Sequence, residues 1–328
     1  MRVLITGGAG FVGCHLTRHI VKNGNQIVLA DNLFRGKRDK DLQELLAFPN
    51  VSLIEADLTE RAAWTKIGGG FDRVYHLASI NGTKLFYETP HEVLRVGLLS
   101  ALYALDWFVT ENGKKDAKIL YTSSNEAYAG GLEAFKQLPI PTPEDVPLVV
   151  ADPYNPRWSY AGQKLAGELL FIHYAKAYDL RMSIVRPHNF YGPRAGYGHV
   201  IPETIEKISA KTDPFTLFGA EETRSFCYIN DAVEAMQAVM ESQKTDGGTY
   251  HIGSHVETKI RDLINEMFAL SLWHPNKVDE KPSPSGSVAR RLADVSKIKR
   301  DTEWEARTTL SDGLKATIEW YLKNPKVG

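Results

Sequence analysis

A tyrosine and a lysine stand four residues apart at the start of a long helical pattern, in the segment Tyr160-Ala161-Gly162-Gln163-Lys164. On a helix this spacing places the phenol and the ammonium on one face. A neighbouring cation stabilises a phenolate and lowers the pKa of the phenol, as a base that deprotonates a hydroxyl requires. Taken alone, such a pair usually marks an ordinary helix face. The hydroxyl-rich strand end Tyr121-Thr122-Ser123-Ser124 favours the chemical interpretation, because strand ends gather ligands in α/β sheets.

Near the N-terminus, three glycines spaced by three residues follow an apolar strand pattern at residues 2–6. Gly7 allows a tight turn from strand to helix, Gly10 lets the backbone approach a pyrophosphate, and Gly13 lets the helix pack closely. The free N–H groups of the first helical turn then face the anion. The alternative is a glycine-rich turn without a ligand.

An acidic residue, Asp31, ends the next apolar run at 26–30. This is the distance at which a carboxylate bonds a ribose 2′-hydroxyl, so strand, glycines and acid together predict dinucleotide binding. A carboxylate repels a 2′-phosphate, which favours NAD over NADP as the cofactor. The cations Arg35, Lys37 and Arg38 follow closely and weaken that preference.

Composition places the chain among ordinary globular proteins. Its 328 residues are 43% hydrophobic, enough for a packed core in one large domain or two. The formal net charge of −1 gives no general attraction to nucleic acid or anionic membrane, and we expect neither as a partner. Cys14 and Cys227 lack a CxxC or His-rich companion, so we expect reduced core residues and no metal site. We expect no signal peptide, no run of membrane-spanning length and a cytoplasmic location.

Short apolar runs alternate with helical patterns in the first part of the chain. The expected strands are 2–6, 26–30, 51–55, 72–77, 117–122 and 180–185, and the expected helices are 11–23, 39–47, 59–67, 90–112 and 158–178. This alternation predicts an α/β fold, a Rossmann-type doubly wound parallel sheet with helices on both faces.

After residue 185 the pattern changes, because 186–225 is rich in Pro, Gly and aromatic residues. Strand and helix patterns return at 226–252, so we expect the dinucleotide-binding domain at 1–185 with these returning segments. A smaller, interleaved α/β substrate-binding domain is expected at 186–225 and 253–328. It includes a Pro/Ser/Gly loop at 280–288 and a closing amphipathic helix at 305–323.

Further motifs are distributed along nearly the whole chain. They are Thr6-Gly7-x-x-Gly10-x-x-Gly13, Asp57-Leu58, His76-Leu77-Ala78-Ser79, Ser123-Ser124-x-x-x-Tyr128, Tyr160-x-x-x-Lys164, Arg186-x-x-Asn189-x-Tyr191-Gly192-Pro193 and Thr223-Arg224-Ser225-Phe226-x-Tyr228-x-x-Asp231. With these motifs in this order, the chain resembles the extended short-chain dehydrogenase/reductase family, the NAD-dependent nucleotide-sugar epimerases, dehydratases and decarboxylases.

The resemblance implies roles for the matching residues. Asp57 would contact adenine and Ser124 would bond the sugar O4. Tyr160 would be the base, and Lys164 would hold both the tyrosine and the nicotinamide ribose. The expected cofactor-binding residues are Gly7, Gly10, Phe11, Val12, Gly13, Asp31, Asn32, Asp57, Leu58, Leu77, Ala78, Tyr160 and Lys164. The catalytic candidates are Ser124, Tyr160, Lys164 and Glu126.

The resemblance also implies a nucleotide-diphosphate sugar as the substrate. Asn189 and Arg224 would grip its diphosphate, with Arg290 or Arg291 assisting. A planar guanidinium binds phosphate oxygens bidentately, although Arg290 and Arg291 could equally be surface cations. The complete set of expected substrate-binding residues is Ser124, Asn125, Asn189, Arg224, Arg290 and Arg291.

Two positions depart from the family pattern. Gly97 stands where the family usually has an asparagine, so a supporting hydrogen bond near the catalytic strand is expected to be absent. Pro284 stands where galactose-type 4-epimerases carry a phosphate-binding arginine. The substrate of any one relative therefore does not transfer directly. The resemblance also implies a homodimer in which helices 90–112 and 158–178 pair with their copies, the alternative being simple packing on the sheet.

The shared chemistry begins with oxidation at C4 of the sugar, with Tyr160 removing the O4 proton. The first expectation is an epimerase, which returns hydride on the other face. A decarboxylase of the UDP-glucuronate type and a 4,6-dehydratase are alternatives, because fold alone does not choose among them. The phrase Thr223-Arg224-Ser225-Phe226 resembles the decarboxylases. A catalytically silent NAD-binding sensor is less favoured because Ser124 and the Tyr/Lys pair are intact.

Glu126 is the residue that best separates these chemistries, because resembling dehydratases and decarboxylases carry Glu there and galactose-type epimerases do not. A carboxylate near C5 could act as a base once C4 is a ketone. We expect instead that Glu126 positions the sugar without C5 chemistry. Asn125 argues against a dehydratase, since an amide cannot protonate a leaving hydroxyl usefully.

Overall fold

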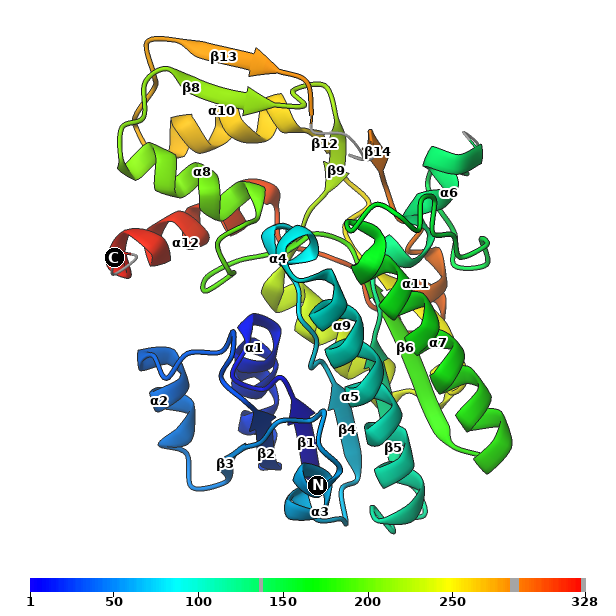
Figure 1. The fold of residues 1–328 in the computed structure, drawn as a ribbon. Coiled ribbons are helices and arrows are strands. Elements are labelled where there is room, and N and C mark those ends of the chain that lie inside the picture. Colours follow the sequence, from blue (N-terminus) through cyan, green and yellow to red (C-terminus); the bar gives the residue numbers. More distant parts are fainter. Residues whose placement is uncertain (136–137, 284–288, 326–328) are drawn as a thin grey trace.

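The computed structural model describes residues 1–135, 138–283 and 289–325 (Figure 1). Pro284 lies outside the described residues, as does most of the expected loop at 280–288. The strands are β1 (Arg2–Thr6), β2 (Gln26–Asp31), β3 (Val51–Glu55), β4 (Arg73–His76), β5 (Lys118–Thr122), β6 (Arg181–Pro187), β7 (Phe190–Tyr191), β8 (Phe215–Phe218), β9 (Thr223–Ser225), β10 (Cys227–Tyr228), β11 (Thr249–Ile252), β12 (Glu257–Lys259), β13 (Val278–Lys281) and β14 (Arg290–Arg291).

The helices include two short 3₁₀ turns. They are α1 (Phe11–Ile20), η1 (Val21–Asn23), α2 (Lys40–Leu46), α3 (Arg61–Ile67), α4 (Thr83–Glu88), α5 (Pro90–Thr110), α6 (Glu126–Phe135), α7 (Trp158–Tyr178), α8 (Val200–Ser209), α9 (Ile229–Glu241), η2 (Gln243–Thr245), α10 (Ile260–Leu270), α11 (Ser296–Thr302) and α12 (Leu310–Lys323).

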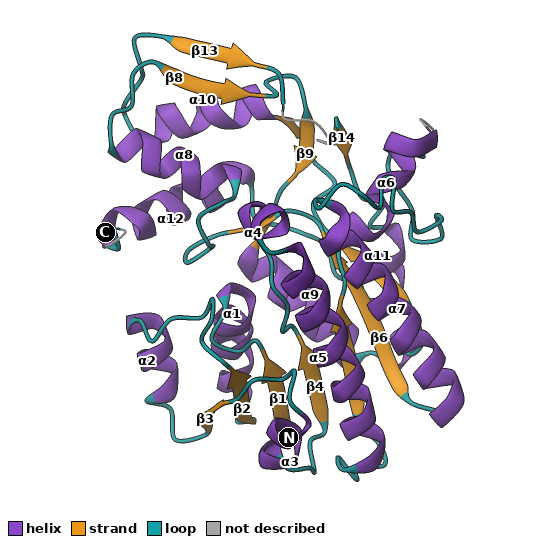
Figure 2. Ribbon diagram, viewed as in Figure 1, coloured by secondary structure: helices purple, strands orange, loops and turns teal. Residues whose placement is uncertain are grey.

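Within the described residues, seven parallel strands form the main sheet in the order β11-β6-β5-β4-β1-β2-β3 (Figure 2). The chain crosses from β3 back past β1 to β4, which reverses the direction of winding. The prediction of a Rossmann-type doubly wound sheet is confirmed. Such a reversal leaves a crevice at the carboxyl ends of the strands next to β1 and β4, where ligands bind in this class of fold.

Both faces of the sheet are covered, which explains why its strands read as nearly continuous apolar runs. On one face α1 and α9 pack together, with Leu16 and Met236 in the same apolar cluster as Ile5. On the other face α3, α5 and α7 bury Trp107 and Phe171 against the sheet. Truncating a buried Leu or Met costs about 2–5 kcal/mol and a buried aromatic about 3–5 kcal/mol, so both layers contribute to holding the strand ends in place.

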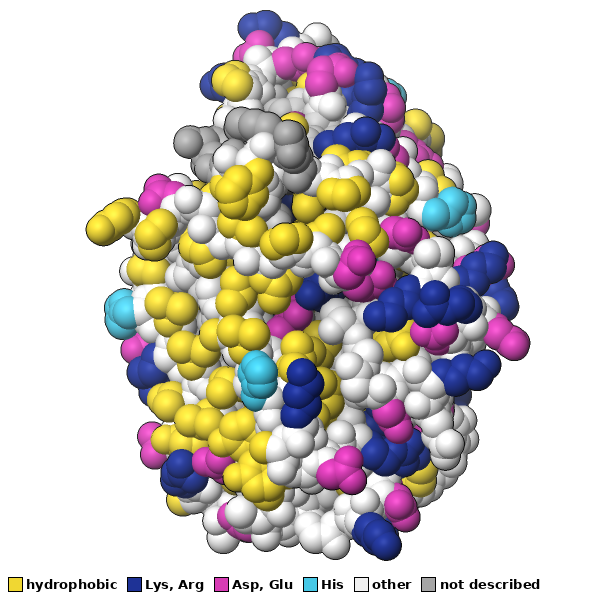
Figure 3. All heavy atoms as spheres, turned by 90° about the vertical axis from the view of Figure 1, so that its right-hand side faces the viewer, with side chains coloured by type: hydrophobic (Ala, Val, Ile, Leu, Met, Phe, Trp, Pro, Cys, Tyr) yellow, Lys and Arg dark blue, Asp and Glu magenta, His cyan; other side chains and the backbone are white. Residues whose placement is uncertain are grey.

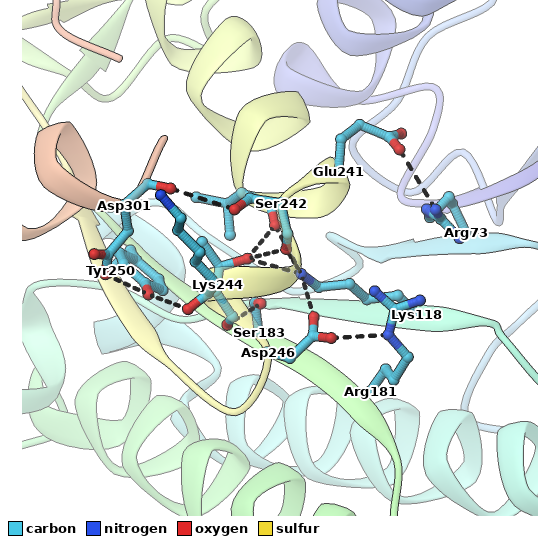
Figure 4. A network of polar contacts seen from close by, with 12 residues as sticks. Arg73, Lys118, Arg181, Ser183, Glu241, Ser242, Lys244, Asp246, Tyr250 and Asp301 are labelled. Carbon is cyan, nitrogen blue, oxygen red and sulfur yellow. Dashed lines mark hydrogen bonds and ion pairs between the residues drawn. The ribbon is translucent and has the colours of Figure 1, made fainter. Parts of the chain in front are cut away.

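The sheet is completed by a segment that returns from later in the sequence. After α9 the chain forms β11, which pairs with β6. A polar network holds the segment between α9 and β11 in place (Figure 4). Lys118 is fully buried there, donates to the carbonyl oxygens of Val239 and Ser242, and pairs with Asp246 at 2.7 Å. Burial lowers the pKa of Lys118, while Asp246 opposes that change. A buried charge with this many partners is well compensated.

A second region of the molecule, in the upper part of Figure 1, contains α8, α10 and α12, which pack in one apolar cluster with β8, and β13 pairs with β8. Its apolar cluster includes Phe215, Phe268 and Leu314. Nearby, β9 lies between β12 and β14 in a short sheet. This region faces the carboxyl ends of the main sheet and therefore forms the other wall of the crevice.

Several elements differ from the sequence-based expectations. The closing helix begins at Leu310 rather than 305, and the expected loop from 280 starts with the last residues of β13. Helices α4, α6, α8, α10 and α11 were not predicted. Helix α5 is long and apolar enough to span a membrane by length and composition, so the prediction that no run reaches that length is wrong. Its buried residues, such as Ala104 and Trp107, pack within the fold, as in the core helix of a globular domain.

Candidate active site

The carboxyl ends of the strands open into one cleft with a volume of about 1220 Å³. Its lining brings together almost all of the expected site residues: Gly7, Gly10, Phe11, Val12, Gly13, Asp31, Asn32, Asp57, Leu58, Leu77, Ala78, Ser124, Asn125, Glu126, Tyr160, Lys164, Asn189, Arg224 and Arg291. Most of these lie at a strand end, on the turn that follows, or on a helix that faces the turn, and Arg224 lies within β9. Arg290 is not among the described residues of the lining.

The turn after β1 has the shape that a phosphate requires. Gly7 adopts a φ of +68°, which a residue with a side chain rarely adopts. A Cβ on Gly13 would lie 2.5 Å from the carbonyl oxygen of Gly7, so α1 can approach the turn only with glycine at this position. The close approach points the first N–H groups of α1 into the cleft, where they suit a pyrophosphate.

Asp31 lies at the end of β2 and is buried. Its two carboxylate oxygens accept hydrogen bonds from the N–H groups of Ala9, at 3.0 Å, and Leu33, at 2.8 Å. Burial raises the pKa of Asp31, while these two backbone donors oppose that change. The same carboxylate therefore braces the glycine turn and lines the cleft next to it.

The loop after β4 is fixed by Thr6, which was not predicted as a site residue. Its Oγ1 lies 3.0 Å from Nδ1 of His76 and accepts hydrogen bonds from the N–H groups of Leu77 and Ala78. Leu77 and Ala78 are thereby held against the glycine turn. The glycine turn, the acid and this loop form one continuous wall of the cleft, and together they fit an extended dinucleotide such as NAD.

The three central catalytic candidates lie together beyond this wall. The hydroxyl of Tyr160 is hydrogen-bonded to Ser124, whose Oγ also accepts from the N–H of Glu126 at 3.2 Å. Nζ of Lys164 lies 5.7 Å from the centre of the Tyr160 ring and donates to the carbonyl oxygen of Thr122 at 2.7 Å. Two hydroxyls and an amine thus face the same end of the cleft.

The environment of Tyr160 corrects the expectation that Lys164 lowers its pKa. Tyr160 is buried and its ring stacks on Phe86 of α4, with centroids 4.8 Å apart. Burial raises the pKa of Tyr160, and the hydrogen bond to Ser124 offsets this only partly. Burial also lowers the pKa of Lys164 to about 7, which reduces its positive charge near neutral pH. The phenol therefore needs a further stabilising charge before it acts as a base near neutral pH.

Glu126 lies between two arginines at the far end of the cleft. Its carboxylate is 2.6 Å from Nη1 of Arg291 and 3.4 Å from Nη2 of Arg157. Burial alone would raise the pKa of Glu126, but the two arginines outweigh burial and hold it below the usual range. The carboxylate is therefore ionised at neutral pH and is already paired.

Donors exceed acceptors around this pair. Among the described residues, no hydrogen-bond partner exists for the buried Nδ2 of Asn125, Nη1 of Arg157 or Nε of Arg291. Each belongs to a residue that lines the cleft. Buried donors are ordinarily satisfied, so three of them on residues that line one cavity make this corner a candidate for binding oxygen acceptors.

The structure separates the two arginines that the sequence could not distinguish. Arg291 points to the cleft, whereas Arg290 makes an ion pair with Glu257, with N–O distances of 2.6 and 2.8 Å, at the surface. Arg224 lines the cleft and is held by Glu222 at 2.7 Å, and burial lowers its pKa to about 10. Asn189 also lines the cleft and donates to the carbonyl oxygen of Ser225 at 2.8 Å.

Two residues that shape the catalytic end of the cleft were not predicted from the sequence. Arg157 stands directly before α7, and nothing in the sequence pairs it with Glu126. Phe86 lies on α4, a helix of only six residues that is too short to give a clear apolar period.

Comparison with known proteins agrees with this geometry. Residues 3–253 match the model of the NAD-dependent epimerase/dehydratase family. The chain is 33% identical to the UDP-N-acetyl-alpha-D-glucosaminuronate decarboxylase of Bacillus cytotoxicus, over 98% of this chain and 97% of that protein. It is 28% identical to the dTDP-glucose 4,6-dehydratase of Salmonella typhimurium, over 99% and 93% of the two chains. The crystal structure of UDP-glucose 4-epimerase from Thermotoga maritima with UDP-glucose superposes with a TM-score of 0.86 at 27% identity, covering 99% of this chain and all of that one.

The chain therefore belongs to the NAD-dependent epimerase/dehydratase family, within the extended short-chain dehydrogenases, and its cofactor is NAD. The relatives act as decarboxylases, dehydratases and epimerases, and all three are enzymes on nucleotide sugars.

Proposed function

We propose that this protein oxidises a nucleotide-diphosphate sugar at C4 in the cleft between the main sheet and the second region. The supporting observation is that Tyr160, Ser124 and Lys164 meet at one end of a cleft whose other wall carries the glycine turn. In this proposal Ser124 bonds the sugar O4, and the oxygen of Tyr160 takes the O4 proton. Lys164, anchored on Thr122, donates a hydrogen bond beside the phenol.

When bound, NAD would supply the hydride acceptor for C4. A positive charge near Tyr160 would lower its raised pKa, which the hydrogen bond to Ser124 and a partly neutral Lys164 do not fully offset. Asp31, Asp57, Leu77 and Ala78 would hold the cofactor along the wall that they form.

For the second step we favour decarboxylation of a sugar that carries a carboxylate at C6. The observation behind this choice lies around Glu126, where Asn125, Arg157 and Arg291 each have a buried donor with no acceptor among the described residues. A uronate carboxylate supplies the missing oxygen acceptors and the negative charge that arginine binds well. Once C4 is a ketone, the C5–C6 bond breaks, carbon dioxide leaves, and its electron pair passes into the enolate of the C4 ketone. A proton from solvent then adds to C5. The C4 ketone would be reduced by the hydride that the bound cofactor took up, and Tyr160 returns the proton to O4.

The 33% identical relative, a decarboxylase of an N-acetylglucosaminuronate, supports the same chemistry. The motif Thr223-Arg224-Ser225-Phe226 also resembles the corresponding segment of the decarboxylases. Glu126, ionised and paired with two arginines, is suited to positioning the sugar and the arginines rather than to removing a proton.

Epimerisation at C4, the first expectation from the sequence, is the second candidate. It is supported by the fold match to UDP-glucose 4-epimerase at 27% identity. A 4,6-dehydratase is less favoured because Asn125 cannot protonate a leaving hydroxyl.

The test is incubation of the purified protein with NAD and, separately, UDP-glucuronate, UDP-N-acetylglucosaminuronate, UDP-glucose and dTDP-glucose, followed by product mass and sugar analysis. We expect a uronate to give a product lighter by carbon dioxide. A product of unchanged mass with inverted C4 would support the epimerase instead, and a product lighter by water would support the dehydratase. NAD binding without product from any of these sugars would favour the silent sensor.

We also propose a cytoplasmic homodimer that uses α5 and α7. These long helices pack side by side, and each has an exposed apolar residue, Leu94 on α5 and Leu169 on α7. Hydrophobic side chains gather on the face viewed in Figure 3, the side on which α7 lies in Figure 1. Light scattering after size-exclusion chromatography tests this proposal, since a monomer would contradict it.

A further inference from the structure

Helix α7 carries a buried amide between its two catalytic candidates. Gln163 follows Tyr160 by three residues, precedes Lys164, and is fully buried. It is not among the described residues that line the cleft. Any influence of Gln163 on the reaction must therefore pass through the groups that it contacts.

The nitrogen end of this amide is bonded to the loop after β4. Nε2 of Gln163 donates to Oγ of Ser79 at 3.0 Å. Ser79 lines the cleft and directly follows Leu77 and Ala78. The same loop contains Ile80 and leads into α4, which carries Phe86, and both side chains share an apolar cluster with Tyr160. One hydrogen bond thus connects the catalytic helix with the loop that flanks both the cofactor wall and the tyrosine ring.

The oxygen end of the amide occupies space that exists only because residue 97 is glycine. A Cβ at Gly97 on α5 would overlap Oε1 and Cδ of Gln163. Glycine is disfavoured inside a helix, so its presence here is explained by the side chain that enters from α7. The sequence expectation that Gly97 leaves a supporting hydrogen bond absent is therefore incomplete, because Gln163 brings an amide into this space from the opposite helix.

Oε1 has no hydrogen-bond partner among the described residues. A buried amide that is only half satisfied contributes little to stability compared with an apolar side chain of the same size. Its retention between Tyr160 and Lys164 thus needs an explanation other than packing.

We propose that Gln163 is a positioning residue, which holds Ser79 and the loop at 77–82 against α7 so that Tyr160 and Lys164 keep their placement relative to the cofactor wall. The inference rests on the proposed C4 oxidation. Gly97 and Gln163 act as a matched pair: the small residue on α5 admits the amide from α7.

The test compares Gln163→Met, which keeps the length of the side chain but cannot donate, with Ser79→Ala and with the double variant. We expect each single variant to lower kcat about three- to tenfold, the size of one lost hydrogen bond, with KM for the sugar and the Kd for NAD within about twofold. The double variant should be no slower than the slower single one, because both remove the same contact. Gly162→Ala is the matched control, since a methyl group there meets only side-chain atoms at 4.0 Å.

Two further measurements separate positioning from general damage. Amide hydrogen exchange at 77–82 should be faster in Gln163→Met and Ser79→Ala than in wild type, and unchanged in Gly162→Ala. The variant Gly97→Asn/Gln163→Ser, which moves the amide to α5, should recover much of the kcat that Gln163→Ser loses.

The positioning role would be refuted by an active wild type whose Gln163→Met and Ser79→Ala variants keep kcat within twofold, or whose two losses multiply. It would also be refuted if exchange at 77–82 did not change in these variants. If the wild type itself converted no nucleotide sugar to product, the proposed function would be wrong, while the exchange result would still report on the contact.

Discussion

Oε1 of Glu126 lies 2.6 Å from Nη1 of Arg291. The two residues come from opposite sides of the cleft, because Glu126 begins α6 just after β5 and Arg291 lies on β14 beside β9. Their ion pair therefore joins the sheet that carries the catalytic end to the region that carries Arg224. It also leaves Nε of Arg291 without a partner among the described residues. A substrate that binds at this end of the cleft would therefore contact an arginine that Glu126 already holds in place.

Arg291→Ala is expected to raise KM for the sugar nucleotide about tenfold or more, since it removes a charged donor at a buried site. Arg290→Ala is the matched control. Its ion pair with Glu257 is exposed, with half of the Arg290 side chain accessible to solvent (52%), so KM should stay within about twofold. Steady-state kinetics measure KM for both variants. Equal changes in KM for the two substitutions would show that Arg291 does not bind the substrate.

Tyr160→Phe is expected to reduce turnover by about 10²–10⁴-fold, the range typical for loss of a general base. NAD should still bind, because the glycine turn and Asp31 are untouched. Tyr154→Phe serves as the control, since Tyr154 is almost fully exposed. Turnover of Tyr160→Phe at near the wild-type rate would show that another group takes the proton.

Asp31→Ala is expected to weaken NAD and to narrow its advantage over NADP, because the repulsion of a 2′-phosphate disappears. The carboxylate also braces the backbone at Ala9 and Leu33, so Asp31→Asn, which keeps one acceptor oxygen, is measured beside it. Calorimetric titration gives both affinities. An unchanged ratio of the NAD and NADP affinities in both variants would show that Asp31 does not contact the ribose.

Stability should fall as the pH is lowered below about 6.5. Burial lowers the pKa of His76 and of His251 to about 3. Between these values and the ordinary histidine pKa, the unfolded chain binds more protons than the folded one, so the free energy of unfolding decreases with falling pH. Each such histidine contributes a slope of up to about 1.4 kcal/mol per pH unit. Urea unfolding at pH 7.5 and 5.5 should show this loss, and His251→Gln should make it shallower. An equal free energy of unfolding at pH 7.5 and pH 5.5 would contradict the lowered pKa of these two histidines.

The wall of the cleft that suits NAD was predictable because its residues are local to strand ends. In a parallel sheet the residues that follow each strand meet at one edge, so Gly7, Asp31 and Ser124 could be placed together from the strand pattern alone. The sequence order of these motifs then carried the family resemblance.

The substrate corner was not predictable in the same way. Arg157, Glu126 and Arg291 lie far apart in the sequence and meet only through tertiary packing. The sequence alone does not distinguish the neighbouring arginines 290 and 291. On β14 one side chain lies at the surface and the other lines the cleft, because successive residues of a strand point to opposite sides. The match of Gly97 with Gln163 was hidden for the same reason, because it depends on how α5 packs on α7.

Oxidation of the sugar at C4 can be tested by following a label at that carbon. UDP-glucuronate or UDP-N-acetylglucosaminuronate with deuterium at C4 is incubated with the protein and NAD, and the label is located by mass spectrometry and NMR. We expect a primary isotope effect on turnover, deuterium on the reduced cofactor during the reaction, and its return to C4 of a product that has lost carbon dioxide. Product formed while the deuterium never leaves C4 would contradict oxidation at C4.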